Sequence, residues 1–330
     1  MKNILKYIKE NIFFILSVLF LIIVLASEFI ELDYSVYAPG GLVNISDRIS
    51  NKQYNSKGSF NMTYVTYRKG TLFNLALAKI IPGQDIIKNE DITVENETID
   101  DSISRSELTM KLSISTAYYI AYTKANKQID ITSSKFYLYY ITPEATTDFK
   151  VADEVLKCDN NEITKHDDIV ECVEKHNEGD EVEFIVNRKG KEKTVKATLK
   201  QDKKIGVIIS ELMSFNKDPE MSFTPDKSEM GSSGGLILTL SLYDALTEED
   251  ITKGKTIAGT GTIEMDGSVG EIAGVKYKIK GAAKKHADLF IVPSANYDEA
   301  KQVIEDNHYD LKLLKADTFD QVLEELKNYN

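Results

Sequence analysis

Two serines flanked by glycines stand where a helix is expected to begin, and a serine hydroxyl is one of the few side-chain groups that can act as a nucleophile. The segment 230–235 (MGSSGG) runs without a break into the apolar segment 236–242 (LILTLSL). A serine at a helix start can expose its hydroxyl, neighbouring glycines let a substrate approach the backbone, and unpaired N–H groups can stabilise an oxyanion. Glycine and serine before a buried helix are also typical of a tight turn, so these residues alone leave both interpretations open.

Other segments that could bind a nucleotide, a cofactor or a metal lack a residue that the chemistry needs. The segment 254–256 (GKT) imitates the end of a phosphate-binding loop, but Glu249 occupies the place of that loop's first glycine. The segment 259–261 (GTG) lacks the third glycine of a dinucleotide-binding loop, because residue 264 is a glutamate. No two histidines have the helical spacing of a metal site. The sequence therefore predicts no nucleotide site, no cofactor and no metal ion.

Length and charge exclude further classes of protein. The 330 residues are enough for about two domains. With 40 Lys and Arg against 52 Asp and Glu, the net charge is -12, and no basic run concentrates positive charge, so we expect no nucleic-acid partner. Two cysteines and four histidines leave little material for a zinc site, a disulfide framework or a histidine-based triad. We expect Cys158 and Cys172 to be small buried hydrophobic residues.

The N-terminal segment has the pattern of a membrane anchor. Three lysines precede the apolar segment 12–26, which can be extended to Ile30. A helix over 12–30 would be about 28 Å long, just enough for one span. Because the basic residues precede the span and acidic residues follow it, residues 1–33 are expected to form a cytoplasmic stub and an anchor in the cell membrane, with the rest of the chain extracytoplasmic. A cleaved signal peptide is the alternative, and it too would export the body of the protein.

Residues 34–130 are expected to form a linker and a first part of a larger domain. The segment 34–57 is rich in Gly, Asn and Ser and indicates an irregular entry. Alternating apolar residues predict a strand over 59–67, and apolar residues spaced by two to four predict a helix over 104–125.

Residues 131–200 have the element order of a small peptide-binding module. The pattern predicts a strand over 136–141, a hairpin over 154–163 turning at Asn160-Asn161, a helix over 164–176, and strands over 182–186 and 193–199. This order resembles the circularly permuted PDZ domains of bacterial proteases. The resemblance implies that an extended peptide adds to a sheet edge. An unrelated small module without a peptide ligand remains the alternative.

Residues 201–330 carry a second motif that decides between the two interpretations of the serines. The segments 258–263 (AGTGTI) and 266–278 (DGSVGEIAGVKYK) follow the MGSSGG segment. Together they resemble the proteolytic domain of the Lon family, which combines a Gly-x-Ser-x-Gly serine, a Thr-Gly strand and a Gly-x-Lys-x-Lys helix start. The resemblance implies that Ser233 is the nucleophile, that Lys278 is the general base, and that Thr260 positions the lysine. Gly231 and Gly234 take the places of the glycines around the serine.

A lysine can replace histidine as the base only if it is neutral. Its pKa must fall from about 10.4 towards 7 or 8, through burial and the absence of a nearby carboxylate. The chain departs from the family in one respect: many Lon-type domains have an acidic residue just before the Gly-x-Ser, whereas here Met230 stands there and Glu229 lies one step earlier. The chain also contains no ATPase segment, so we expect proteolysis without ATP.

Together these expectations describe an α+β protein with an N-terminal transmembrane helix, a PDZ domain and a Lon-type proteolytic domain. The arrangement resembles the membrane-anchored PDZ-containing Lon-like serine proteases of low-GC Gram-positive bacteria, and it implies protein or peptide substrates and homo-oligomers. Because a strand and a helix are expected before the PDZ module, we hypothesise that this module is inserted into the proteolytic domain.

Two other functions would fit parts of the sequence. One is a membrane-tethered PDZ peptide-binding adaptor whose protease-like domain is inactive. The other is a tail-specific carboxy-terminal processing protease, which also combines a PDZ domain with serine and lysine. Those enzymes have a different serine motif and a dyad closer together in the sequence.

Overall fold

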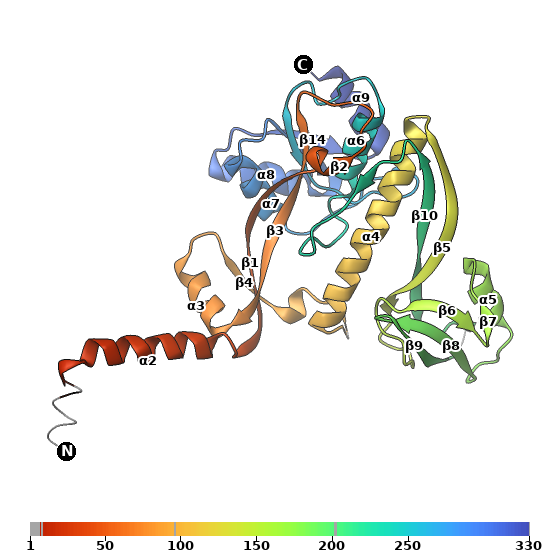
Figure 1. The fold of residues 1–330 in the computed structure, drawn as a ribbon, viewed down its shortest axis with the longest axis horizontal. Helices are drawn as coiled ribbons and strands as arrows, with labels where there is room; N and C mark the ends of the chain where they lie inside the picture. Colours follow the sequence, from red (N-terminus) through yellow and green to blue (C-terminus); the bar gives the residue numbers. More distant parts are fainter. Residues whose placement is uncertain (1–6, 8, 96, 201–202, 330) are drawn as a thin grey trace. The chain divides into compact units, whose positions relative to one another are not determined.

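The computed structural model describes residues 7, 9–95, 97–200 and 203–329 (Figure 1). The chain divides into two compact units. The first contains the described residues up to Gly40 together with 65–93, and the second contains 41–64 together with the described residues from Val94 onward. Strands β1 (Glu31–Asn44) and β3 (Ser59–Thr71) are long enough to contribute residues to both units.

The N-terminal helix is shorter than the sequence predicts. Helix α2 runs over Ile12–Ser27, so its 16 residues extend about 24 Å, against about 30 Å for a bilayer core. Among the described residues, no helix has the length and apolar character that crossing a membrane requires, so the predicted transmembrane helix over 12–30 is not supported. Residues 28–30 leave the helix because they hold the next elements: Glu28 accepts a hydrogen bond from Oγ1 of Thr71, and the carbonyl of Ile30 accepts one from the N–H of Leu72.

The rest of the first unit is a small sheet with one helix. Strand β1 pairs antiparallel with β4 (Asp85–Lys88), with Tyr34 opposite Lys88. Helix α3 (Leu72–Ile80) begins where Oγ1 of Thr71 accepts a hydrogen bond from the N–H of Asn74, which is an ordinary N-cap.

The second unit contains the parallel part of a six-stranded sheet whose order is β14-β13-β12-β3-β1-β4. Strands β12 (Thr256–Gly259), β13 (Leu289–Pro293) and β14 (Lys312–Ala316) run parallel to one another, and β12 also pairs parallel with β3. Helices α7 (Val275–Lys284) and α8 (Tyr297–Asn307) make the crossovers between β12, β13 and β14, and α9 (Phe319–Asn328) follows β14. This region is therefore mixed α/β, with more parallel sheet than the predicted α+β class implies.

Alternate side chains of the central strands point to opposite faces of this sheet, and both faces are buried. Ile257, Leu289 and Ile291 join a core on the face covered by helices α4 (Ile99–Lys124) and α6 (Gly235–Leu246). Ala258, Phe290 and Val292 join a second core on the face covered by α7 and α8. Strands that are covered on both faces are expected to be continuously apolar, which explains the sequence LFIVP of β13.

The predicted strand over 59–67 and helix over 104–125 are confirmed as β3 and α4, both longer than predicted. Helix α4 begins earlier because Thr98 and Asp101 form a capping box. Phe60 of β3 and Tyr122 of α4 share one core with Leu240 of α6. Segments before and after the PDZ-like module thus share a core, as the insertion hypothesis requires, while independent folding without that module stays a prediction.

The PDZ-like module is a six-stranded sheet with one helix. The strand order is β10-β5-β6-β8-β9, and β7 (Asn161–Glu162) pairs with β6. The other bounds are β5 (Gln128–Ile141), β6 (Glu154–Cys158), α5 (His166–Glu174), β8 (Glu181–Arg188), β9 (Lys191–Thr198) and β10 (Val207–Asp218). Cys158 pairs with Asn161, so the hairpin turns at Asp159-Asn160, one residue earlier than predicted, and both turn residues have positive φ.

The prediction for the two cysteines is wrong in one respect. Cys158 and Cys172 are buried as expected, but they form a disulfide that joins the end of β6 to α5, with Cα atoms 6.3 Å apart. That separation is ordinary for a disulfide. The bond therefore fixes the helix of the module to its sheet.

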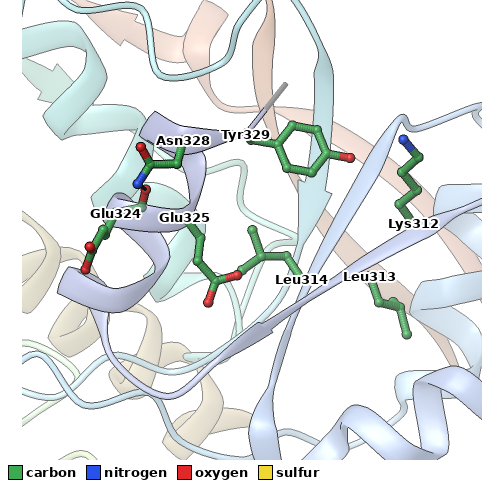
Figure 2. Close-up of a pocket in the computed structure, with 7 residues that line it drawn as sticks. All are labelled: Lys312, Leu313, Leu314, Glu324, Glu325, Asn328 and Tyr329. Atoms are coloured by element: carbon green, nitrogen blue, oxygen red, sulfur yellow. Dashed lines mark hydrogen bonds between the residues drawn. The ribbon is translucent and has the colours of Figure 1, made fainter.

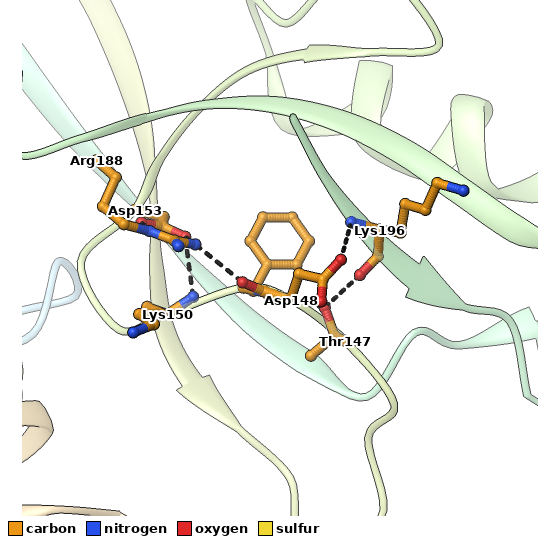
Figure 3. Close-up of polar contacts among 7 residues, drawn as sticks. Thr147, Asp148, Lys150, Asp153, Arg188 and Lys196 are labelled. Atoms are coloured by element: carbon orange, nitrogen blue, oxygen red, sulfur yellow. Dashed lines mark hydrogen bonds and ion pairs between the residues drawn. The ribbon is translucent and has the colours of Figure 1, made fainter. Parts of the chain in front are cut away.

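A network of ion pairs and hydrogen bonds holds the loop between β5 and β6 (Figure 3). The guanidinium of Arg188 donates to both carboxylate oxygens of buried Asp153, at 2.7 and 2.6 Å, and to the carbonyl of Asp148 at 2.9 Å. Asp148 in turn accepts from the backbone N–H of Lys196, and Thr147 donates to the carbonyl of the same lysine. The loop is thus fixed to β8 and β9 by contacts inside the module.

Strands β5 and β10 extend beyond the module as a paired ribbon that rests on α4. The register runs from Ile141 opposite Val207 to Gln128 opposite Asp218. Oγ of Ser115 on α4 donates to the carbonyl of Met213, and the rings of Tyr119 and Phe215 stack. Both chain connections to the PDZ-like module pass through this ribbon.

Removing the module at a paired position should leave a folded protein. Ser134 and Met213 are opposite each other in the ribbon, so a variant lacking 135–212 can be closed with an Asn-Gly turn. We expect it to be soluble and to unfold in one cooperative transition, measured by circular dichroism. The fragment 201–330 is the control: because it lacks β3 and α4, it should not fold. A stable, soluble 201–330 fragment would overturn the insertion hypothesis.

Candidate active site

Ser233 lies in the turn immediately before α6. All twelve residues of this helix are buried, so its start is held in one place by the core. Gly231 has a φ of +91°, which a residue with a side chain rarely adopts, and its N–H donates to the carbonyl of Ser106 on α4. A Cβ on Gly235 would lie 2.5 Å from Oγ of Ser113, so the backbone can approach α4 only with glycine there. The glycines of the motif thus serve the close packing of this turn.

The segment that follows β12 binds the backbone beside the serine. The N–H of Gly261 donates to the carbonyl of Ser233 at 2.7 Å, and the N–H of Leu236 donates to the carbonyl of Gly261 at 3.1 Å. Oγ1 of Thr260 also donates to the carbonyl of Ser233, at 2.8 Å. Three hydrogen bonds therefore connect the two motif segments that the sequence singled out.

Lys278 reaches this turn from α7. The helix begins after Gly274, whose φ is +75°. Nζ of Lys278 lies 2.7 Å from Oγ of Ser233 and donates to Oγ1 of Thr260 at 2.9 Å. Because the hydroxyl hydrogen of Thr260 is directed at the carbonyl of Ser233, its oxygen is available as an acceptor for the lysine.

The lysine is buried without a counter-charge. Lys278 is 3% exposed, and burial alone lowers the pKa of its amine from 10.5 to about 7. Among the described residues no carboxylate forms an ion pair or hydrogen bond with it. Near neutral pH a substantial fraction of the amine is therefore uncharged and can accept the proton of Ser233.

Backbone donors for an oxyanion lie beside the same hydroxyl. In the described part of the chain, the N–H groups of Ser233 and Gly234 have no hydrogen-bond partner. They lie at the start of α6, where the helix dipole favours negative charge. A nucleophile, a neutral base and unpaired donors are the parts that acyl transfer needs.

The structure brings together Ser233, Lys278 and Thr260 and places Gly231 and Gly234 in the turn around the serine. Sequence reasoning missed the residues that hold the preceding loop. Arg48 donates to both carboxylate oxygens of Glu229, at 2.7 and 2.8 Å, and to Asp226 at 2.8 Å. Glu229 is therefore engaged by a cation, and no local pattern in the sequence indicates a partner so distant along the chain.

Two further places could hold a ligand. Strand β10 is at the edge of the PDZ-like sheet, and Val207 and Ile209 pack against the core that includes Ile169 and Val173 of α5. An edge strand of a sheet is the arrangement to which an extended peptide can add. An open pocket of about 500 Å³ lies between β14 and α9 (Figure 2). None of its lining residues belongs to the serine and lysine site.

A possible metal-ligand cluster within the described residues consists of Cys158, Asp159 and Cys172. Its two sulfurs are bonded to each other, so they do not provide the thiolates that bind metals.

Comparison with known proteins identifies two regions. Residues 224–328 match the C-terminal proteolytic domain of Lon protease (S16), and residues 137–199 match the PDZ domain. The similar proteins include a mitochondrial Lon protease homolog of Phaeodactylum tricornutum, 33% identical over 97 residues, which are 28% of this chain and 10% of that protein. An archaeal Lon protease of Halobacterium salinarum is 35% identical over 78 residues, 24% of this chain and 10% of that protein. A Lon protease of Desulfatibacillum aliphaticivorans is 32% identical over 94 residues, 28% of this chain and 11% of that protein.

The chain thus spans about a tenth of the length of the curated relatives that it matches. The region that matches the Lon proteolytic domain, residues 224–328, contains Ser233, Thr260 and Lys278. The chain combines a PDZ domain with a Lon-type proteolytic domain, and this combination supports a serine peptidase.

Proposed function

We propose that this chain is a serine endopeptidase that acts without ATP through a dyad of Ser233 and Lys278. The observation that carries the proposal is the 2.7 Å separation between Nζ of Lys278 and Oγ of Ser233. The lysine is buried, and no carboxylate of the described residues pairs with it. A buried amine beside a hydroxyl is a general base that needs no histidine.

The reaction follows from these contacts. Neutral Lys278 takes the proton of Ser233 while Oγ attacks the carbonyl carbon of the peptide bond. The N–H groups of Ser233 and Gly234 hold the developing oxyanion. The protonated lysine then gives its proton to the leaving amine, and water hydrolyses the acyl-enzyme with Lys278 again as base. Thr260 keeps Nζ directed at Oγ throughout, because it binds both the amine and the carbonyl of Ser233.

The PDZ domain supplies the means to choose substrates. Its edge strand β10 offers unpaired backbone groups to an extended segment of a protein or peptide, and the ribbon of β5 and β10 connects that strand to α4. We propose that the domain docks substrates or regulates access to Ser233.

We also propose that the protein is attached to the cell membrane through α2 and that its catalytic region is extracytoplasmic. Every residue of α2 has an unburied side chain, and those side chains are almost all apolar. The disulfide between Cys158 and Cys172 supports an oxidising compartment, since such bonds are rare in the cytosol.

The first prediction concerns the two residues of the dyad. On a fluorescent casein substrate, we expect Ser233→Ala and Lys278→Arg each to lower kcat by about 10²- to 10⁴-fold. Alanine removes the nucleophilic hydroxyl, and arginine keeps the positive charge but cannot become neutral and act as a base. Ser232→Ala and Lys284→Ala are matched controls, a neighbouring serine and an exposed lysine of the same helix, and should keep the full rate. Equal rates in all four variants would remove the dyad, and an inactive but peptide-binding wild-type protein would favour the adaptor function.

The second prediction concerns pH. Because Lys278 must be neutral, kcat/KM should rise as pH rises through about 7 and level off above it. The lowered pKa sets this limb, since an ordinary lysine would keep the rate rising to about pH 10. The measurement is a pH profile with a neutral peptide substrate. A profile that stays flat across neutral pH would contradict the assignment of Lys278 as base.

The third prediction concerns Thr260. Thr260→Val keeps the side-chain volume but removes both hydroxyl contacts, so we expect kcat to fall by up to about 10²-fold with little change in KM. Thr260→Ser keeps the hydroxyl and should retain most of the rate. If valine and serine at this position give the same kcat, the hydroxyl does not position the lysine.

A further inference from the structure

Helix α3 exposes a stripe of apolar residues, which reverses the usual pattern of a surface helix. Leu72, Ala76 and Ile80 are spaced by four residues, so they lie along one face, and all three are exposed. Ile80 is 75% exposed, and Ile81 just beyond the helix is exposed as well. A helix in water normally presents polar residues on that face, so this stripe needs an apolar partner.

The other apolar residues of α3 pack into the first unit, and the stripe lies on the opposite side of the helix. Ala78 is buried, and Phe73, Leu75 and Leu77 are partly buried. The packing that fixes α3 is therefore already provided by these four residues. The exposed side chains of Leu72, Ala76 and Ile80 are therefore available to a partner outside the described chain.

The stripe continues the apolar surface of α2. Figure 1 shows α3 beside the C-terminal end of α2, and both belong to the first unit. Two hydrogen bonds fix the start of α3 to the residues after α2: Leu72 N–H to the carbonyl of Ile30 at 3.0 Å, and Oγ1 of Thr71 to Glu28 at 3.1 Å. Between the two helices, Phe29 is 86% exposed. Exposed apolar side chains thus occur on α2, at Phe29 between the two helices, and on α3.

We propose that α3 lies in the interfacial region of the membrane that α2 enters, with Leu72, Ala76, Ile80 and Ile81 in contact with lipid. This inference rests on the proposed membrane attachment and adds a second contact to it. Lipid fits better than a protein partner, because α2 is apolar all round, as a helix surrounded by acyl chains is. Lys79 lies next to Ile80 in the sequence and is exposed, as a cationic side chain that meets lipid phosphate groups would be.

Tryptophan fluorescence tests the inference directly, because the chain contains no tryptophan. Three single-tryptophan variants of the full chain, Ile80→Trp, Phe20→Trp and Tyr54→Trp, would be reconstituted into vesicles of phosphatidylethanolamine and phosphatidylglycerol whose acyl chains are brominated near the headgroup or near the chain end. Phe20 reports on α2, and Tyr54 lies in the second unit as the control.

We expect Ile80→Trp to show blue-shifted emission and to be quenched more by the shallow bromine than by the deep one. Phe20→Trp should be quenched as well, and Tyr54→Trp should not. Quenching of Phe20→Trp without quenching of Ile80→Trp would overturn the inference and leave membrane attachment intact, which would make a protein partner the remaining occupant of the stripe. If neither is quenched, both the attachment and the inference fail. Casein cleavage by the same variants in detergent verifies that each one is folded.

Discussion

The chemistry that we propose for this protein depends on a lysine amine that is kept out of water without a negative charge beside it. A charged ammonium in that position would lose most of its hydration with nothing to compensate, so the neutral form is favoured. Any carboxylate close to Nζ of Lys278 would restore the charge and abolish the base. The fold satisfies this condition by burying Lys278 on α7 beside buried apolar residues of the same helix. In the described part of the chain, the hydrogen-bond partners of the amine are two hydroxyls, those of Ser233 and Thr260.

The same condition explains how nearby acidic residues are arranged. Glu229 precedes the serine by only four positions, yet its carboxylate is engaged by Arg48. Arg48 also binds Asp226, so one cation forms ion pairs with both acidic residues of the loop that leads to Ser233. The loop is held further where β11 (Ser222–Phe223) pairs with β2 (Ile49–Ser50), next to Arg48 in the sequence. One short segment from the front of the chain thus fixes both the path and the charge of this loop.

Motifs and periodicity predicted much of the structure, and they failed where the outcome depends on distance in space. The serine turn, Thr260 and Lys278 were found from the resemblance to the motifs of Lon-type domains, and β3 and α4 from apolar spacing. The disulfide was missed because only the fold brings Cys158 and Cys172 to bonding distance. The end of α2 was placed too late, since an apolar count cannot show that Glu28 and Ile30 hold Thr71 and Leu72. The contacts of Arg48 could not be predicted from the sequence, because its partners lie 181 and 178 residues away along the chain.

The parallel pairing of β3 with β12 has a consequence for the order in which the protein assembles. Asn61 and Thr63 on β3 bind carbonyls of Ile257 and Gly259, each across 196 residues of chain, and the PDZ domain lies within that interval. Contacts of such long range form late, because a large loop must close before they contribute. During synthesis the PDZ domain is therefore complete before the central sheet can close. Ser233 and Lys278 then meet only after β12 and α7 have been made, so under the proposed mechanism a shorter, partly made chain has no working nucleophile with which to cut its neighbours.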